Sequence, residues 1–372
     1  MPETHPSQPQ RAVGYALNVF PYNSLAELES CLAGPVLRIK ERVFPDEVFP
    51  IELRFSERIV RDFQQDPGAI AQLKQFLTEH NLALVTINGF VMPAFHGERV
   101  KERVYLPAWH ESSARVRFTN ECVELLAALA PGTEFVSVSV PFGALKPVTL
   151  AAVAPNILHC AQHAATVHRR TGTQCLVALE PEPGLCGETT DEVLEFFDRF
   201  VPAELRPYLG VNFDLCHQLV EFEDITASVQ RLQTAGVPLA KIHVSNAAEL
   251  PELKPFYADS IYLHQVCGAD ATGTRRWFSL DWPSAPPALD LARYRVHYHM
   301  PVCPMPELTV GTTLTDVERF LQTATVPAGV PFIIETYTWP EQLRGADRLV
   351  DNICRELAWV RQKTVANRAG SF

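Results

Sequence analysis

The alternation of short apolar runs with helical stretches constrains the fold of this chain more than any other feature. Eight runs rich in Val, Ile, Leu and Phe occur along the 372 residues, and helical spacing follows each of them. The expected strands cover residues 14–20, 49–55, 82–90, 134–140, 175–181, 208–214, 239–246 and 331–339. Eight strand–helix units are the repeat of a parallel (β/α)₈ barrel.

The main rival is an open, doubly wound sheet. Such a sheet normally has a glycine-rich turn after its first strand. The junction after residues 14–20 reads NVFPYNSL and contains no glycine. The sequence therefore favours a single α/β (β/α)₈ TIM barrel over residues 13–362, with disordered tails at 1–12 and 363–372.

A long insertion interrupts the repeat between the seventh and eighth strands. It runs from Ala247 to Leu291 and is rich in Pro and Trp. The next segment, RYRVHYHMPVC at 293–303, alternates like a strand but has no place in the eightfold period. A helix beginning near Thr313 then leads to the eighth strand.

Charge and cysteine usage restrict the partners and the compartment. A net charge of −11 disfavours nucleic acid, because phosphate backbones are bound by basic surfaces. No apolar run reaches the ~18 residues of a membrane-spanning helix, and the N-terminus lacks the pattern of a signal peptide. The nine cysteines show no C-x-x-C spacing, which is typical of reduced thiols. We therefore expect a cytoplasmic protein without a membrane span or a nucleic-acid partner.

Four polar residues close the last four expected strands. They are Glu180 in LVALEPEPG, Asp214 in LGVNFDLCH, His243 in AKIHVSNA and Glu335 in PFIIETYTW. In a barrel these strand ends meet at the rim that carries the active site. A buried carboxylate there is costly unless it binds a cation or pairs with a base, and for each residue alone a structural ion pair is an equal alternative. Together, three carboxylates and an imidazole suit a divalent metal: Mn²⁺, Mg²⁺, Zn²⁺ or Co²⁺.

Three more histidines are candidates for the same rim. His217 follows Asp214 by three residues, a spacing that can direct both side chains to one cavity. His297 and His299 are two residues apart and so lie on one face of an extended segment. The three could hold a second metal or bind substrate hydroxyls. The alternatives are a capping role for His217 and a solvated pair at 297 and 299.

Weaker candidates for substrate binding come from the first three units. Asn18, Arg54 and Asn88 end the first, second and third strands and should face the same rim. Arg54 could equally form a structural ion pair. His96 lies in a polar loop that is either a lid over the site or simply solvated.

The order Glu, Asp-x-x-His, His and Glu over the last four strands resembles the xylose isomerase-like TIM-barrel superfamily. That superfamily includes sugar isomerases, ketose 3-epimerases, cyclitol enzymes and endonuclease-IV-like abasic-site endonucleases. The resemblance implies that Glu180, Asp214, His243 and Glu335 bind a metal and that His217 contacts substrate or a second metal. Within the superfamily, GYALNVFPYNSLAE, VTINGFVMPAFHGERVKERVYLPAW, KIHVSNA and RVHYHMPV resemble metabolite-traffic proteins of the EboE family. That likeness implies a role in making or exporting a metabolite.

The sequence differs from the endonuclease branch at one of the three metal sites of that branch. In that branch extra histidines after strands three and four complete a cluster, whereas here the fourth strand ends SVSVPFG and only His96 follows the third. By contrast, His297 and His299 resemble the Asp-x-His element that holds another metal there. The number of metals therefore stays open.

The favoured function is a metal-dependent isomerase or epimerase that acts on a small sugar, polyol or cyclitol. Glu180 and Glu335 would remove and return a proton at carbon through an enediolate. One alternative is a binding or traffic protein that uses the same site without catalysis. Another is a metal-dependent phosphoester hydrolase of the endonuclease-IV-like branch. Association into a homo-oligomer is compatible with the sequence, which indicates no interface residue.

Overall fold

Eight parallel strands close into a barrel in the computed structural model, which describes residues 12–93, 99–131, 135–254, 261–339, 343 and 345–369. The order around the barrel is β1-β12-β7-β6-β5-β4-β3-β2. The strands are β1 (Val13–Ala16), β2 (Phe49–Arg54), β3 (Leu82–Asn88), β4 (Val136–Pro141), β5 (Cys175–Glu180), β6 (Leu209–Asp214), β7 (Leu239–Val244) and β12 (Phe332–Ile334). The predicted (β/α)₈ barrel is therefore confirmed.

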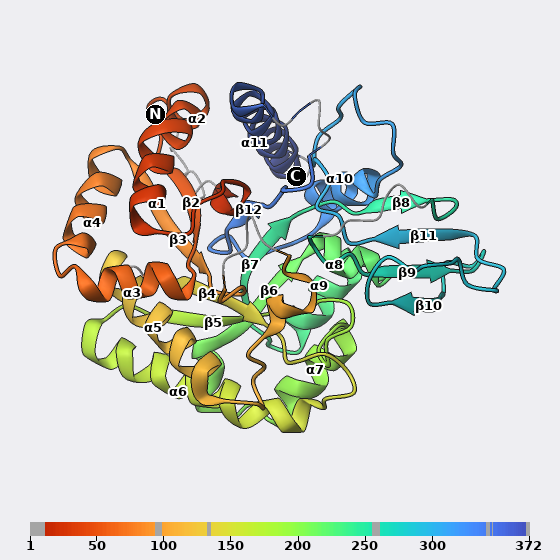
Figure 1. Ribbon diagram of the computed structural model, residues 1–372, viewed down its shortest axis with the longest axis horizontal. Helices are drawn as coiled ribbons and strands as arrows, with labels where there is room; N and C mark the ends of the chain where they lie inside the picture. Colours follow the sequence, from red (N-terminus) through yellow and green to blue (C-terminus); the bar gives the residue numbers. More distant parts are fainter. Residues whose placement is uncertain are drawn as a thin grey trace, which may run out of the picture.

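Helices surround the barrel and bury their apolar faces against it (Figure 1). They are α1 (Leu25–Cys31), α2 (Leu37–Val43), α3 (Glu57–Gln65), α4 (Ala69–Glu79), α5 (Ser113–Leu129), α6 (Leu150–Thr171), α7 (Thr190–Arg199), α8 (Leu215–Val220), α9 (Ile225–Thr234), α10 (Leu314–Thr323) and α11 (Ala346–Ala369). Side-chain caps define several starts: Ser24 forms a capping box with Glu27, and Thr189 forms one with Glu192.

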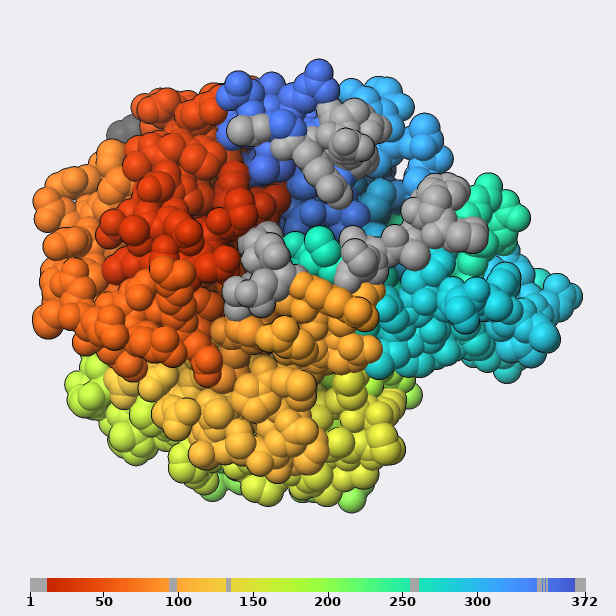
Figure 2. Space-filling model, in the orientation of Figure 1, coloured from red at the N-terminus to blue at the C-terminus, as the bar shows by residue number. Residues whose placement is uncertain are grey.

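The insertion between β7 and β12 forms a second, antiparallel sheet beside the barrel. Its strands are β8 (Ala248–Leu250), β9 (Val266–Ala269), β10 (Arg275–Ser279) and β11 (Arg293–Val296), in the order β10-β9-β11-β8. The sheet projects to one side as a lobe (Figures 1 and 2). The strand-like segment that had no place in the eightfold period is β11, which pairs with β8 and β9 of the insertion itself.

The region between β2 and β3 contains two helices: α3 follows β2 directly, and α4 follows α3. The last helix continues to Ala369, beyond the expected barrel end at 362. The predicted N-terminal tail lies outside the described residues, except for residue 12.

Two predictions on membrane spans and thiols can be compared with the structure. None of the described helices is both long and apolar enough to cross a membrane. All nine cysteines are buried with free thiols.

A buried carboxyl group, Glu356, fastens α11 to the barrel close to the rim. Its Oε2 accepts a hydrogen bond from the Tyr15 hydroxyl at 2.7 Å, and its Oε1 accepts from the Val302 peptide N–H and the Thr336 hydroxyl, both at 2.8 Å. Burial raises the pKa of Glu356 to about 7, against the smaller opposing effect of these donors. Glu356 therefore joins the exits of β1 and β12 to the segment that follows β11.

This carboxyl group should make the stability of the metal-free protein depend on pH. Between pH ~4.5 and ~7 the folded state keeps a proton on Glu356 that the unfolded state releases, so the free energy of unfolding falls as pH rises. We expect Glu356→Gln to remove about 3 kcal/mol of that fall. Urea unfolding in EDTA at pH 5 and pH 8 measures it.

The matched control is Glu41→Gln, which changes an exposed carboxylate on α2. The control should show the wild-type change in stability between the two pH values. An equal change in Glu356→Gln and wild type would show that the carboxyl group titrates normally.

Candidate metal centre

Four side chains from adjacent strands converge at the carboxyl end of the barrel. Glu180 and Asp214 end β5 and β6, His243 is the last residue but one of β7, and Glu335 directly follows β12. The Nδ1 atom of His243 lies 3.4 Å from Glu180 Oε1, 3.4 Å from Asp214 Oδ2 and 3.1 Å from Glu335 Oε2. One ligand atom from each of the four residues lies within 4.8 Å of the others.

The donor atoms of this group suit a divalent ion. All four side chains are buried, and two carboxylate oxygens, Glu180 Oε2 and Asp214 Oδ2, have no hydrogen-bond partner among the described residues. Buried carboxylate oxygens without donors are costly, and a cation would satisfy them. Three carboxylates with one imidazole are a suitable set for Mn²⁺ or Mg²⁺ and acceptable for Zn²⁺.

Burial and neighbouring charges shift the pKa values of these side chains in different directions. Burial alone would lower the pKa of His243, but Glu335 and Glu52 raise it well above its ordinary value. Burial raises the pKa of Glu180, while His243 lowers the pKa of Glu335 despite burial. A cation that binds at His243 Nδ1 must therefore displace a proton, so metal binding should release protons.

A carboxylate below the site fixes the tautomer of His243. Glu52 projects from β2 into the barrel, where its Oε2 accepts from His243 Nε2 at 3.0 Å and from Lys241. Burial opposes the negative charge, but Lys241 and His243 lower the pKa of Glu52 to about 2. Because Nε2 donates to Glu52, the lone pair of Nδ1 is left for a metal, as in the carboxylate–histidine pairs of metal sites.

We expect Glu52→Gln to lower the affinity for Mn²⁺ by about 10- to 100-fold. The amide can present N–H to Nε2 of His243, which would move the ring proton to Nδ1 and block the ligand position. Isothermal titration of the metal-free protein with Mn²⁺ gives the affinity.

Glu41→Gln, on the protein surface, serves as the control and should bind Mn²⁺ like wild type. Because Glu52→Gln leaves Lys241 without its carboxylate, the double variant with Lys241→Met should be measured as well. Wild-type affinity in both Glu52 variants would exclude this positioning role.

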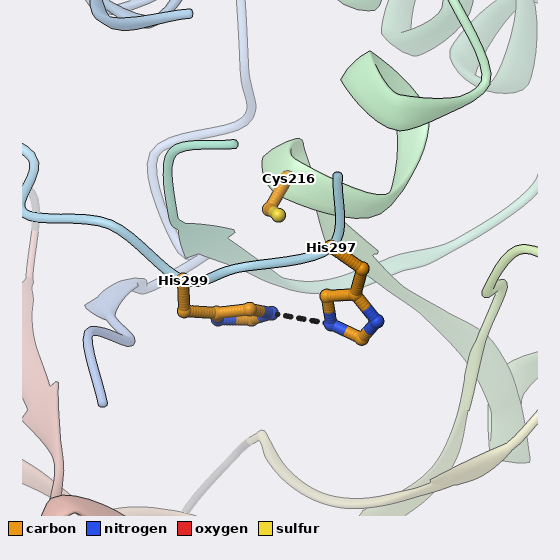
Figure 3. A group of neighbouring side chains, drawn as sticks. All are labelled: Cys216, His297 and His299. Carbon is orange, nitrogen blue, oxygen red and sulfur yellow. Dashed lines mark hydrogen bonds between the residues drawn. The ribbon is translucent and has the colours of Figure 1, made fainter. Parts of the chain in front are cut away.

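Three imidazoles form a second cluster beside the first. The Nε2 atoms of His217 and His297 are 3.0 Å apart, those of His297 and His299 are 3.0 Å apart, and those of His217 and His299 are 3.3 Å apart. Figure 3 shows the rings of His297 and His299 turned toward each other, with the Cys216 thiol near the backbone that joins them. Ligands of a tetrahedral zinc ion with bonds of ~2.05 Å are separated by ~3.3 Å, which is close to these spacings.

The other nitrogen of each ring identifies the tautomer. Nδ1 of His217 is 2.9 Å from the Pro181 carbonyl, and Nδ1 of His299 is 3.0 Å from the Glu335 carbonyl. Nδ1 of His297 is 2.7 Å from the side-chain carbonyl of Gln265. A carbonyl oxygen only accepts, so each Nδ1 carries the proton and three Nε2 lone pairs face one another. A proton or a cation is needed between them.

The pKa values separate His217 from His297 when no metal is bound. Burial and the neighbouring His217 together lower the pKa of His297 to about 4. Burial opposes a charge on His217 too, but Asp214, Glu182 and other carboxylates raise its pKa. Of these two rings, His217 therefore holds the proton in the absence of metal.

The insertion completes this cluster, and the sequence prediction missed its supporting residues. The His297 peptide N–H donates to the Gln265 carbonyl at 2.9 Å, directly after the β9–β11 pairing. The Gln265 amide donates to Glu182 at 2.9 Å, and Glu182 also accepts from the Tyr105 hydroxyl at 2.7 Å. Glu182 had a visible signal, the repeated acid in EPEP after β5. No sequence pattern marked Gln265, Tyr105 or Glu52 as site residues. Only the folded structure shows that they lie beside the two clusters.

The weaker candidates lie on the opposite half of the rim. The Asn18 amide donates to Glu335 Oε1 at 2.6 Å, and the Asn88 amide approaches the same oxygen at 3.5 Å. Arg54 lines the same pocket and forms no ion pair among the described residues, so the structural ion pair is excluded for that part of the chain. His96 lies outside the described residues.

A wall of apolar and aromatic side chains surrounds the pocket above both clusters. It comes from the loop after β3, the turn Lys101–Tyr105 and the insertion: Phe90, Val91, Val104, Tyr105, Tyr262 and Leu263. The Tyr337 ring stacks on His299 with centroids 4.5 Å apart. Such a wall limits access of water to the two clusters.

The fold and the site define a (β/α)₈ barrel with buried groups of carboxylates and imidazoles that could hold a metal ion at its carboxyl rim. The family model described as "Xylose isomerase-like TIM barrel" matches residues 50–293. The chain belongs to this family. Comparison with curated proteins found no significant match.

Solved structures share the whole fold at low identity. A xylose isomerase domain protein from Planctomyces limnophilus is 13% identical, with a TM-score of 0.51 over 96% of this chain and 99% of that one. A xylose isomerase-like TIM barrel protein from Mycobacterium smegmatis, in complex with magnesium, is 14% identical, with a TM-score of 0.52 over 96% and 98%. A D-tagatose 3-epimerase-like protein is 14% identical, with a TM-score of 0.50 over 95% and 100%. At these identities the likeness concerns the fold alone.

Proposed function

We propose that this protein is a metal-dependent isomerase or epimerase that transfers a proton at a carbon of a small sugar, polyol or cyclitol. The observation that carries the proposal is the approach of three carboxylates to Nδ1 of His243, at 3.1–3.4 Å, among side chains that are all buried. Membership of a family that contains sugar isomerases and epimerases supports it. Within this function, a role in metabolite traffic like that of the EboE family remains an extension suggested by sequence resemblance alone.

Glu180, Asp214, His243 and Glu335 would hold the first divalent ion, and His217, His297 and His299 would hold a second. When bound, the first ion supplies Lewis acidity that stabilises negative charge on two adjacent substrate oxygens. His297 and His299 directly follow β11 of the antiparallel sheet, so the second position depends on that sheet.

Glu180 and Glu335 are suited to opposite halves of the proton transfer. Their strands, β5 and β12, are separated in the barrel by β6 and β7, so the two carboxylates approach the pocket from different sides. Burial raises the pKa of Glu180, which makes it the stronger base toward a C–H bond. Glu335 is held ionised by His243 and oriented by the Asn18 amide, and it exchanges the proton on the other face.

Exchange of carbon-bound hydrogen with solvent tests the proposed function. The Mn²⁺-loaded protein would be incubated in D₂O with a panel of ketoses, cyclitols and their oxidised forms. Deuterium incorporation at one carbon, followed by NMR, is the expected result. Binding of panel members with no exchange on any of them would favour the traffic protein that only binds a metabolite.

The histidine cluster favours one second candidate, a metal-dependent phosphoester hydrolase of the endonuclease-IV-like branch. That chemistry uses more than one metal, and three Nε2 atoms within 3.3 Å of one another suit an additional ion. The net charge of −11 counts against nucleic acid as its substrate. Release of an alcohol and a phosphomonoester from a small phosphodiester, without deuterium incorporation, would support the hydrolase.

A further inference from the structure

Arg54 is a buried cation that lines the pocket and has no carboxylate partner within the described part of the chain. The residue is only 1% exposed and lines the pocket together with Glu180 and Glu335, two of the proposed metal ligands. Burial lowers the pKa of Arg54, yet a guanidinium keeps its charge at neutral pH. A buried, unpaired charge is unfavourable and calls for a ligand of opposite sign.

Hydrogen bonds fix one edge of the Arg54 guanidinium, and its remaining N–H groups are available to a ligand. Nη2 donates to the Tyr22 carbonyl and to Asn23 Oδ1, the latter at 2.9 Å. The Tyr22 ring lies alongside, 5.3 Å from the guanidinium carbon. Nε and Nη1, which carry three of the five N–H donors, have no hydrogen-bond partner in the described part of the chain. The group is thus positioned in advance, with free donors.

Arg54 stands across the barrel mouth from the metal-ligating residues. It ends β2 and is in register with Asn88, the last residue of β3, while Asn18 follows β1. β2 and β6 are opposite each other in the closed barrel, so Arg54 faces the strand that carries Asp214. A ligand that binds a metal with one end can reach Arg54 with the other.

We propose that Arg54 binds an oxyanion substituent of the substrate, so that the substrate is a carboxylated or phosphorylated sugar, polyol or cyclitol rather than a neutral one. This inference rests on the proposed function for the nature of the carbon frame. Among the described residues that line the pocket, Arg54 is the only Lys or Arg. Guanidinium groups bind carboxylate and phosphate through charge-assisted hydrogen bonds.

With two divalent ions bound, the net charge of the pocket would favour an anionic ligand. Glu180, Glu182, Asp214 and Glu335 supply four carboxylates around the two clusters. Two divalent ions would neutralise these four charges, and Arg54 would then leave the pocket positive. Hydroxyl groups of a neutral substrate could accept from Arg54 but would leave its charge uncompensated, whereas an oxyanion both accepts these hydrogen bonds and neutralises the charge.

Calorimetric binding of three matched ketoses to the Mn²⁺-loaded protein tests the proposal. D-Fructose, D-fructuronate and D-fructose 6-phosphate differ at carbon 6, which is a hydroxymethyl group, a carboxylate or a phosphorylated hydroxymethyl group. We expect at least one anion to bind tenfold or more tightly than fructose, and which anion wins distinguishes carboxylate from phosphate. Arg54→Met should remove the preference, and Arg54→Lys should restore part of it. Arg58→Met, an exposed change of equal charge on α3, should keep it.

Equal binding of the three ketoses, no binding of either anion, or a preference that persists in Arg54→Met would overturn the proposal. The preference of the wild-type protein is informative even if an Arg54 variant fails to fold. Binding does not require turnover, so failure of deuterium exchange rejects the isomerase function alone. Exchange on neutral ketoses with no anion preference rejects the role of Arg54 alone.

Discussion

Glu335→Gln is expected to lower deuterium exchange at the substrate carbon by about 10³-fold or more while the barrel stays folded. Glutamine has nearly the same shape, and its carbonyl can still accept the Asn18 hydrogen bond that now reaches Glu335 Oε1 at 2.6 Å. The amide cannot accept a proton from carbon, so the acid–base step fails although the pocket keeps its form. The exchange assay in D₂O gives the rate, and urea unfolding gives the stability.

The exposed Glu307→Gln is the control and should exchange at the wild-type rate. The metal content of Glu335→Gln must be measured as well, because Glu335 is also a proposed ligand. Exchange close to the wild-type rate in a metal-loaded Glu335→Gln protein would remove Glu335 from the proton transfer.

The second large effect concerns metal binding. The protein should bind two divalent ions, and different mutations should remove each of them. We expect about two divalent ions per chain in wild type, and more than ~100-fold weaker binding of the first in Asp214→Asn. Asp214 Oδ1 accepts from the His217 peptide N–H at 3.0 Å and from the Ser245 hydroxyl at 2.7 Å. These donors would keep the oxygen of asparagine in place and turn its NH₂ group toward the cation. His299→Gln should lose only the second ion.

Elemental analysis after dialysis, together with titration by Mn²⁺ and Zn²⁺, measures both ions. Asp46→Asn and His159→Gln change exposed residues of the same types and should leave both ions bound. Retention of two ions by His299→Gln would exclude the three imidazoles as a metal site. A wild-type protein with a single ion would mean that a proton on His217 satisfies the cluster.

The barrel could be predicted from the sequence because each strand–helix unit is formed by residues that are close together in the chain. Apolar runs such as CLVALE and LGVNFD are strands buried on both faces, and period and length alone separate them from the helices. The insertion could not be assigned in the same way. Its strand β11 pairs with β8 and β9, and no local pattern indicates which of these distant segments lie side by side.

The candidate site was predictable where its residues end strands. Glu180, Asp214, His243 and Glu335 could be read from the chain because the barrel brings all strand ends to one rim. Glu52 could not, since an acid in the middle of FPIELRF gives no sign that it meets His243 and Lys241 across the barrel. The open donors of Arg54 likewise became evident only from the fold.

The antiparallel lobe has a consequence for how the two ions would exchange with solvent. Its strands are short and lie outside the closed barrel, so they can separate from it without breaking any barrel strand pairing. Such a transient opening would carry His297 and His299 away from His217 and release the second ion, while the proposed ligands of the first ion, at the ends of barrel strands, would stay together. The rate at which the second ion leaves would thus report on opening of the lobe.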